Sequence, residues 1–362
     1  MVYNSAHQTP FMFNRKIPVG ILGATGVVGQ RLVQLLEEHP WFEVKWLGAS
    51  ERSAGLPYVA AAKWRLKSHI PVDVESIPVS ACTPDSAPRV VFSALDGSVA
   101  SEVEPQFADA GHAVISNASA FRMEADVPLV IPEVNPQHTK LLECQKWRKK
   151  SGGFIVTNPN CSAIGLVLAL APLHHRYGIE KVFVVTMQAV SGAGYPGVPS
   201  LDILGNVIPY IGKEEEKMEA ESRKLLGTLD GRRVVDADFQ ISAQCNRVPV
   251  ENGHMESVSI KLKQPADMQE LLATWGTFRG VPQELRLPNA PEEPVHVSSA
   301  TDRPQPALDV DAGAGMSVTV GRLRHCNLLD WKFTVLSHNT IRGAAGAALL
   351  NAELLKAQGF LD

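Results

Sequence analysis

A glycine-rich turn between an apolar run and an amphipathic segment constrains this chain more than any other feature. Residues 17–22 are mostly apolar and end at Gly23, and residues 27–38 then carry apolar side chains at helical spacing up to the break before Pro40. The pattern predicts a strand, a tight turn and a helix. A helix that directly follows a short buried strand is typical of a parallel α/β sheet.

The same alternation continues downstream. Apolar runs and helix-like stretches follow in turn, with the runs at 44–49, 89–95, 113–116 and 154–157 and the helix-like stretches at 98–110 and 136–150. This order predicts a doubly wound α/β domain of the Rossmann type over residues 17–159. The Ala-rich C-terminal segment, 339–362, is expected to return as a helix that completes this domain. Residues 1–16 show no periodicity and are expected to be a flexible tail.

A second domain is predicted over residues 160–338, where the pattern changes. An apolar helix is expected at 162–176, and charged helices near 214–226 and 265–278. Five β-rich runs accompany them, at 181–190, 247–250, 256–262, 317–323 and 332–337. They predict an α+β domain with a largely antiparallel sheet. The Pro-rich stretch 287–306 is expected to be a surface loop.

Composition restricts the function. The 362 residues suffice for two domains, and 34 Lys+Arg against 38 Asp+Glu give a net charge of −4, which argues against a nucleic-acid partner. No apolar run approaches the length of about 18 residues that spans a bilayer, and no secretory signal is recognisable, so we expect a cytoplasmic protein without a membrane partner. The 5 cysteines are scattered, which suits neither a disulfide framework nor a zinc site.

The turn at 23–29, GATGVVG, predicts a dinucleotide site. Its glycines permit a tight turn and a close approach to a pyrophosphate, whose charge then lies at the N-terminus of the following helix. The spacing GxxGxxG is less common than GxGxxG, and a plain Gly-rich turn is the alternative. The residues expected to contact the cofactor here are Gly23, Thr25, Gly26, Val27 and Val28.

The end of the second strand predicts which cofactor is bound. Ser50, Arg52 and Ser53 follow this strand and suit the 2′-phosphate of NADP, because a guanidinium binds phosphate through two parallel hydrogen bonds. The alternative is that Glu51 binds the ribose hydroxyl of NAD, with Arg52 as a solvated neighbour. NADP is the favoured cofactor.

Cys161 is the strongest candidate nucleophile. It lies in Asn158-Pro159-Asn160-Cys161-Ser162, between a β run and an apolar helix. The helix N-terminus is expected to lower the pKa of the thiol and to supply amides for an oxyanion, although a buried structural cysteine is the alternative. A nucleophilic cysteine beside a nicotinamide implies aldehyde oxidation through a thiohemiacetal and a thioester, or the reverse reduction.

His254 is the candidate acid/base. Asn252-Gly253 is a hairpin turn signal between two β runs, and in a two-residue hairpin Arg247 and His254 would lie on the same face. Arg247 could then bind a carboxylate. Pro249 makes the register of this hairpin uncertain, and an ordinary surface histidine is the alternative.

Taken together, the motifs resemble those of aspartate-semialdehyde dehydrogenases of the fungal and archaeal branch. The resemblance extends from Val19 to Leu354. The motifs that carry it are GATGVVG at 23–29, SNASAFR at 116–122, PEVN at 132–135, NPNCS at 158–162, QAVSGAG at 188–194, EEEKM at 214–218, NRVPVENGH at 246–254 and SHNTIRGAAG at 337–346.

The resemblance implies a role for each site residue. Cys161 would be the nucleophile, His254 the acid/base, and Gln188 would help to orient the substrate. Arg247 would bind the substrate carboxylate and Glu214 its ammonium, although Glu215 and Glu216 are adjacent carboxylates. The attacking phosphate would be held by Arg122, Asn160 and Lys217. The nicotinamide would be bound by the loop 191–194, with Gly192 and Ala193, and by Asn339.

The resemblance also implies the reaction. An enzyme of this family reduces L-4-aspartyl phosphate to L-aspartate 4-semialdehyde with NADPH, releases inorganic phosphate and needs no metal, in threonine, methionine and isoleucine synthesis. It would act as a homodimer or homotetramer. The alternatives are a malonyl-CoA reductase on the same scaffold and a non-catalytic, NADP-binding regulatory protein.

Overall fold

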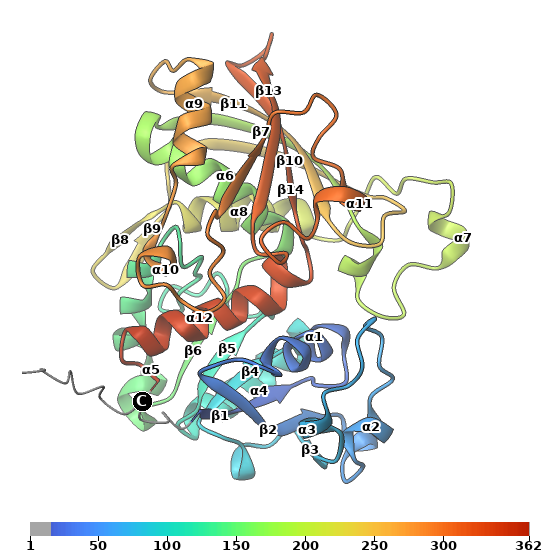
Figure 1. The fold of residues 1–362 in the computed structure, drawn as a ribbon. Coiled ribbons are helices and arrows are strands. Elements are labelled where there is room, and N and C mark those ends of the chain that lie inside the picture. The colour runs from blue at the N-terminus through green and yellow to red at the C-terminus, as the bar shows by residue number, and fades with distance from the viewer. Residues whose placement is uncertain (1–15, 362) are drawn as a thin grey trace, which may run out of the picture.

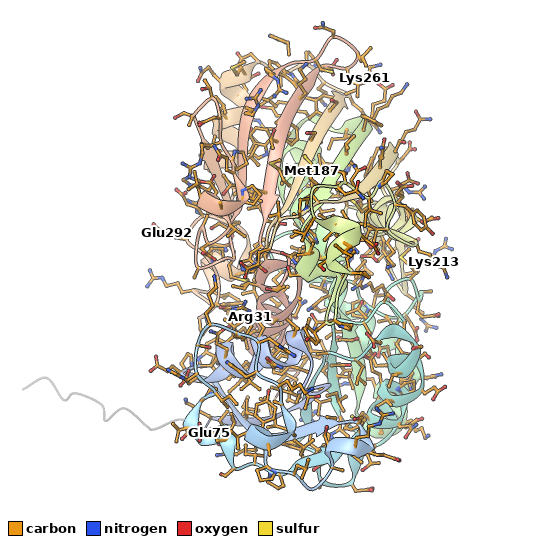
Figure 2. The ribbon with its side chains drawn as sticks, turned by 90° about the vertical axis from the view of Figure 1, so that its right-hand side faces the viewer. Arg31, Glu75, Met187, Lys213, Lys261 and Glu292 are labelled. Atoms are coloured by element: carbon orange, nitrogen blue, oxygen red, sulfur yellow. The ribbon has the colours of Figure 1, made fainter. Side chains whose placement is uncertain are left out.

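The computed structural model describes residues 16–361 and contains two six-stranded sheets, one above the other (Figure 1). Apart from Lys16, the tail predicted at 1–16 lies outside the described residues. A view from the side places Met187 in the upper domain, and Arg31 in the lower domain near the level where the two meet (Figure 2).

The first sheet confirms the predicted Rossmann-type architecture. Its strand order is β3-β2-β1-β4-β5-β6, and every neighbouring pair is parallel. The strands are β1 (Ile17–Leu22), β2 (Phe42–Ala49), β3 (Val79–Ala81), β4 (Val90–Ser93), β5 (Ala113–Ser116) and β6 (Phe154–Thr157). Helices α1 (Val27–Leu36) and α4 (Gly97–Asp109) follow β1 and β4. Since parallel strands all end at one edge, the segments after β1 and β2 lie at the same edge of the sheet.

One predicted helix of this domain is built differently. In place of a single helix over 136–150 there is a 3₁₀ helix, Pro136–Cys144, and then the short α5 (Lys146–Ser151). The break occurs at Gln145, whose backbone is extended. Its side-chain amide bonds both the N–H and the carbonyl of Ile155 in β6, so the residue is held by the sheet and cannot continue a helix.

The second sheet is mixed. Its order is β10-β7-β11-β14-β13-β12, in which the central pairs are antiparallel but β10–β7 and β12–β13 are parallel. The strands are β7 (Ile179–Gln188), β10 (Gln240–Arg247), β11 (His254–Leu262), β12 (Val295–Ser298), β13 (Val318–His325) and β14 (Trp331–Ser337). Strand β12 lies inside the stretch predicted as a loop, where four residues between prolines pair with the edge of β13.

The predicted hairpin through Asn252-Gly253 is wrong. Strand β7 lies between β10 and β11, so the strands on either side of this turn do not pair with each other. The segment after β10 bonds instead to the end of β7, where Val248 N–H donates to the carbonyl of Gln188 and Val190 N–H donates to that of Val250. Pro249 has no N–H and could not have continued a ladder toward β11.

Three helices cover the inner face of the second sheet: α6 (Cys161–Tyr177), α8 (Glu214–Leu225) and α9 (Met268–Gly276). Helix α6 is buried almost all round, as expected of a helix enclosed in a core. Helix α8 also covers the edge strand β10, because its Glu215 and Glu219 accept the N–H groups of Cys245 and Ala243. These bonds satisfy backbone donors that an edge strand otherwise exposes.

The C-terminal segment packs between the two domains, as the red helix in Figure 1 shows. A π-helical turn, Ile341–Ala345, precedes α12 (Gly346–Ala357), and Ala348, Leu349 and Leu355 belong to the core of the first domain. Within the turn, Arg342 forms a bidentate ion pair with Glu133, and both side chains are fully buried. Removing one partner of such a pair leaves a buried charge uncompensated, so the pair fixes the position of this turn.

The remaining elements are short. They are α2 (Tyr58–Ala61), α3 (Val72–Glu75), α7 (Ser200–Ile203), α10 (Val281–Glu284), α11 (Pro306–Asp309), β8 (Thr228–Asp230) and β9 (Arg233–Val235). None of the helices within residues 16–361 has the length and apolar character that a membrane crossing requires.

Candidate active site

Cys161 is the first residue of α6 and is positioned by the cap of that helix. The preceding strand β6 ends at Thr157. Asn160 is the N-cap, and its Oδ1 accepts the N–H groups of Ser162 (2.9 Å) and Ala163 (3.1 Å). This cap satisfies N–H groups that the first turn of a helix leaves unpaired. The thiol is therefore attached to a fixed point of the fold.

His254, the first residue of β11, faces the thiol. Its Nε2 lies 3.3 Å from Cys161 Sγ, and Ala189 N–H donates to its Nδ1 over 3.1 Å. The ring is fully buried, whereas Cys161 is partly exposed. The contact with Ala189 orients the imidazole, so that Nε2 is placed to exchange a proton with the sulfur or with an atom bound to it.

Burial keeps both groups of this pair uncharged. It raises the pKa of the Cys161 thiol to about 12, with a further contribution from the negative charge of Glu214 that is larger than the opposing effect of Arg122 or of Arg247 taken singly. Burial and Arg247 lower the pKa of His254 to about 3. The expected low pKa of the thiol is therefore wrong: the backbone at the start of the helix does lower the pKa, but desolvation and Glu214 outweigh this effect.

Arg247 and His254 come together, although not through a hairpin. Arg247 ends β10, His254 begins β11, and Gln188 ends β7 between them, so all three lie at one end of the second sheet. Arg247 Nη1 donates to the Ala189 carbonyl (2.8 Å). A Cβ added to Gly192 would lie 2.8 Å from Arg247 Nη1 and 2.9 Å from His254 Cε1, so the loop after β7 approaches both side chains as only glycine permits.

Helix α8 brings one of the three candidate glutamates close to Cys161. Glu214 is buried, and its Oε1 accepts a hydrogen bond from Asn160 Nδ2 (2.8 Å) while Oε2 lies 3.5 Å from Lys217 Nζ. Glu215 bonds the backbone of β10, and Glu216 is exposed. Glu214 is thus the carboxylate beside Cys161.

The three residues assigned to phosphate lie around the same turn. Arg122 Nη1 pairs with Glu221 (3.0 Å), Arg122 Nη2 donates to the carbonyl of Asn117 (2.7 Å), and Lys217 projects from α8. Asn160 already uses Oδ1 and one Nδ2 hydrogen in the cap and in its bond to Glu214. Sequence reasoning missed Glu221. Its position seven residues after Glu214, on the same face of a helix, is the signal that could have found it.

The glycine turn of the first domain has the features that a pyrophosphate requires. Gly23 has φ +74°, and a Cβ there would lie 2.6 Å from the carbonyl oxygen of Ala94. Gly26 is the N-cap of α1 and provides no side-chain cap, so the first N–H groups of the helix, from Val27 onward, can bind an anion. Thr25 and Val28 flank these positions and are partly exposed.

The remaining cofactor candidates lie at two places. Ser50, Arg52 and Ser53 directly follow β2 in a short 3₁₀ turn, and Ser50 and Arg52 are exposed. Gly192 and Ala193 are exposed in the turn after β7. Asn339 links this turn to the residue before His254, because Nδ2 donates to Ser191 Oγ and Oδ1 accepts the Gly253 N–H, both over 2.8 Å. One Nδ2 hydrogen of Asn339 remains for a ligand.

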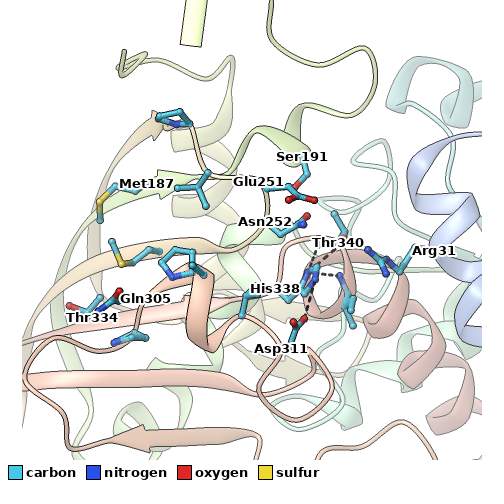
Figure 3. A pocket seen from close by; sticks show the side chains of 18 of the residues that line it. Arg31, Met187, Ser191, Glu251, Asn252, Gln305, Asp311, Thr334, His338 and Thr340 are labelled. Carbon is cyan, nitrogen blue, oxygen red and sulfur yellow. Dashed lines mark hydrogen bonds and ion pairs between the residues drawn. The ribbon is translucent and has the colours of Figure 1, made fainter. Parts of the chain in front are cut away.

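A cavity of about 1190 Å³ lies beside this site (Figure 3). Val27 and Ser191 of the two cofactor segments line it, together with Arg31 and His338, whose Nε2 lies 3.9 Å from Asp311 Oδ1. Cys161 is not among its lining residues. The contact of Cys161 with His254 thus lies outside this cavity, although Asn252 and Met255, on either side of His254 in the sequence, line it.

Residues 16–361 contain no group of three or more His, Cys, Asp or Glu side chains that could hold a metal ion. The charges around Cys161 are those of protein side chains. Arg122, Lys217 and Arg247 supply the cationic groups, and Glu214 and Glu221 supply anionic ones. Such guanidinium and ammonium groups bind phosphate and carboxylate directly.

Comparison with known proteins shows which family the chain is similar to. Residues 18–142 match the NAD binding domain of semialdehyde dehydrogenases, and residues 170–342 match their dimerisation domain. The aspartate-semialdehyde dehydrogenases of Methanothermobacter thermautotrophicus and Schizosaccharomyces pombe are 52% and 46% identical, over 94% and 95% of this chain and 99% of each relative. The crystal structure of aspartate semialdehyde dehydrogenase with NADP from Candida albicans has a TM-score of 0.88 at 44% identity and covers 95% of this chain and 99% of its own.

The chain belongs to the semialdehyde dehydrogenase family. Archaeal and fungal members are among its relatives, which confirms the resemblance drawn from the motifs.

A further residue, Gly343, packs closely against Cys161. Gly343 lies in the π-helical turn, and a Cβ there would lie 2.7 Å from Cys161 Cβ and 3.0 Å from Cys161 Cα. The buried pair of Arg342 and Glu133 holds the π-helical turn in place, so the turn has little freedom to move away from Cys161. The motif containing Gly343 is visible in the sequence, but this contact depends on tertiary packing.

Gly343→Ala should therefore displace Cys161 and lower kcat for a semialdehyde by about 10- to 100-fold, because a shift of about 1 Å at a reacting atom has effects of this size. Steady-state kinetics and thermal unfolding of the purified variant test this. Gly276→Ala is the matched control, since a Cβ there meets nothing within 4 Å. An unchanged kcat in Gly343→Ala would show that the turn moves to make room for the added Cβ and that Cys161 stays in place.

Proposed function

We propose that this protein is an NADP-dependent aspartate-semialdehyde dehydrogenase. It interconverts L-aspartate 4-semialdehyde, phosphate and NADP⁺ with L-4-aspartyl phosphate and NADPH, in the synthesis of threonine, methionine and isoleucine. The observation that carries the proposal is the contact of Cys161 Sγ with His254 Nε2 at 3.3 Å, with Arg247, Glu214, Arg122 and Lys217 around it. The NADP complex of the Candida albicans relative supports the choice of cofactor.

The charges beside the nucleophile favour an amino-acid substrate. In the proposed mode Arg247 binds the α-carboxylate and Glu214 the α-ammonium, and Gln188, buried at the end of β7, orients the acyl group. The malonyl thioester of a malonyl-CoA reductase has no ammonium group. It would leave the buried carboxylate of Glu214 without a cationic substrate partner, at a cost in binding. Glu214 therefore favours aspartate semialdehyde.

The chemistry follows from the neutral Cys161–His254 pair. Because Nδ1 accepts the Ala189 N–H, the neutral ring of His254 carries its proton on Nε2. As Sγ attacks the aldehyde carbon, Nε2 gives this proton to the aldehyde oxygen and takes up the thiol proton in its place. The ammonium–Glu214 and carboxylate–Arg247 contacts hold the aldehyde carbon in reach. The turn at 23–29 and the loop at 191–194 would hold NADP, which would supply the hydride acceptor for oxidation of the thiohemiacetal to the thioester. The resulting thioester is attacked by phosphate held at Arg122, Lys217 and the free Nδ2 hydrogen of Asn160, and the sulfur of Cys161 leaves as the acyl phosphate forms.

The test of the function is NADPH formation from aspartate semialdehyde, with phosphate and coenzyme A compared as acyl acceptors. We expect activity with phosphate and none with coenzyme A. Cys161→Ala should abolish turnover and leave NADP binding near that of the parent, because no other thiol contacts His254 among the described residues.

Cys144→Ala is the control for loss of a thiol outside the site. Substantial turnover by Cys161→Ala would exclude the covalent mechanism. Coenzyme A-dependent turnover would instead support the malonyl-CoA reductase, and NADP binding without turnover by the parent would support a regulatory protein.

We propose further that Arg52, with Ser50 and Ser53, binds the 2′-phosphate of NADP, whereas Glu51 is not a ribose ligand. Arg52→Ala should then weaken NADP binding by about ten- to hundredfold, or about 1.5–3 kcal/mol for a lost charge-assisted contact, and leave NAD binding nearly unchanged. Titration of cofactor fluorescence measures both affinities. Lys45→Ala, which removes an exposed cation from β2, is the matched control. Equal losses for both cofactors would give the role to Glu51.

We also propose a cytoplasmic homodimer, of which two copies could form a homotetramer. The match of residues 170–342 to a dimerisation domain supports self-association. The face of the second sheet opposite α6 carries Phe183, which is 46% exposed. Leu201, in the short helix α7, is 91% exposed. Exposed apolar groups of this kind are typical of a contact surface. The free cysteines fit a reducing compartment.

If this face forms the contact, Phe183→Asp should shift the protein toward the 39.2 kDa monomer at micromolar concentration, because a charge would be buried without a partner. Sedimentation velocity measures the distribution. Leu328→Asp, in the turn after β13 and 92% exposed, should leave the distribution of the parent unchanged. A parent that sediments only as a monomer would exclude self-association.

A further inference from the structure

Glu221 connects the cation that binds phosphate to the turn that carries the nucleophile. Its side chain is only 2% exposed, and both carboxylate oxygens are engaged. Oε1 lies 3.0 Å from Arg122 Nη1, and Oε2 accepts the N–H of Asn160, the residue before Cys161, over 2.6 Å. One rigid carboxylate thus holds two parts of the site that are 38 residues apart in sequence, from 122 to 160.

We propose that Glu221 is a positioning residue for the phosphate step of the reaction, an inference that rests on the proposed function. It acts through Arg122 and through the backbone of Asn160, and does not itself touch the substrate. Its function is to hold the guanidinium at a fixed place relative to Cys161, so that phosphate is delivered to the thioester carbon.

The surroundings of Arg122 support this assignment. With Nη1 on Glu221 and Nη2 on the carbonyl of Asn117, Arg122 keeps a buried Nε–H that has no protein partner within residues 16–361. A buried donor without a partner is costly unless a ligand satisfies it. The guanidinium is therefore held firmly and still has hydrogens to offer an anion.

Helix α8 holds the same segment at a second point. Lys224, one turn after Glu221, donates from Nζ to the carbonyls of Arg122, Glu124 and Val127 over 2.7, 2.8 and 3.1 Å. Glu214, Glu221 and Lys224 share one face of the helix, at spacings of seven and three residues. A single helix thus sets the place of the guanidinium, the Asn160 N–H and the Asn160 amide relative to one another.

The substitution Glu221→Gln removes the negative charge and one acceptor oxygen while it keeps the size and shape of the side chain. A glutamine would keep one acceptor oxygen, but its NH₂ would face either Arg122 or the Asn160 N–H, so two donors would oppose each other. Misplacement of Arg122 affects the attacking phosphate, whereas substrate and cofactor are bound by other residues. The substitution should therefore weaken the binding of phosphate and leave the binding of substrate and cofactor nearly unchanged.

In assays of NADPH formation from aspartate semialdehyde, Glu221→Gln should raise KM for phosphate by about tenfold or more. KM for the semialdehyde and for NADP should stay within about twofold of the parent, and kcat at saturating phosphate within about threefold. Glu219→Gln is the matched control. It removes another backbone-bonded carboxylate of α8, but one that faces β10, and should leave KM for phosphate unchanged.

A double-mutant cycle completes the test. If Glu221 acts on phosphate through Arg122, then adding Glu221→Gln to Arg122→Gln should lower kcat/KM for phosphate by much less than Glu221→Gln does alone, because only the bond to the Asn160 N–H is then left to disturb. Additive losses would overturn the proposal, as would a fall in kcat and thermal stability with KM for phosphate unchanged. Glu221→Asp, which keeps the charge but is too short to hold both partners, serves the same measurement if the glutamine variant does not fold. A parent without phosphate-dependent turnover would refute the proposed function instead.

Discussion

The hydrogen bonds of Asn160 are the constraint on which the rest of the site depends. Its Oδ1 caps α6, its Nδ2 bonds Glu214, and its N–H bonds Glu221. The cap places Cys161 at the first position of a helix buried in the core, and the two bonds to glutamates place α8 beside it. The residues that bind substrate and phosphate in the proposed mode therefore take their positions from the same residue that positions the nucleophile.

Sequence patterns predicted the elements whose signals are local. The strand, glycine turn and helix at 17–36 are of this kind, and so is the cysteine at the start of an apolar helix. The Asn252-Gly253 signal failed because a local turn preference cannot show that β7 enters the sheet between β10 and β11. Pairing at that edge is decided by the whole sheet, and a Pro at 249 excludes the alternative ladder.

Tertiary packing also explains what was missed around Cys161. In the sequence, Glu221 is one of several charges on a helix, and only the fold shows its bonds to Arg122 and Asn160. Gly343 is one small residue of an Ala-rich segment, and only the fold places it against Cys161. The expected low thiol pKa failed for a related reason. A helix N-terminus is visible in sequence, whereas burial and the position of Glu214 are properties of the folded site.

The charges that help to keep Cys161 and His254 neutral are the charges that the proposed substrate would cancel. After burial, Glu214 contributes most to the raised pKa of Cys161, more than Arg247 contributes against it, while Arg247 lowers the pKa of His254. An ammonium on Glu214 removes the larger of the two opposing effects on the thiol, so its pKa falls. A carboxylate on Arg247 weakens the repulsion felt by an imidazolium, so the pKa of His254 rises. In the proposed mode, substrate binding would thus bring the two proton affinities closer, so that the thiol would give up its proton only when there is an aldehyde to attack.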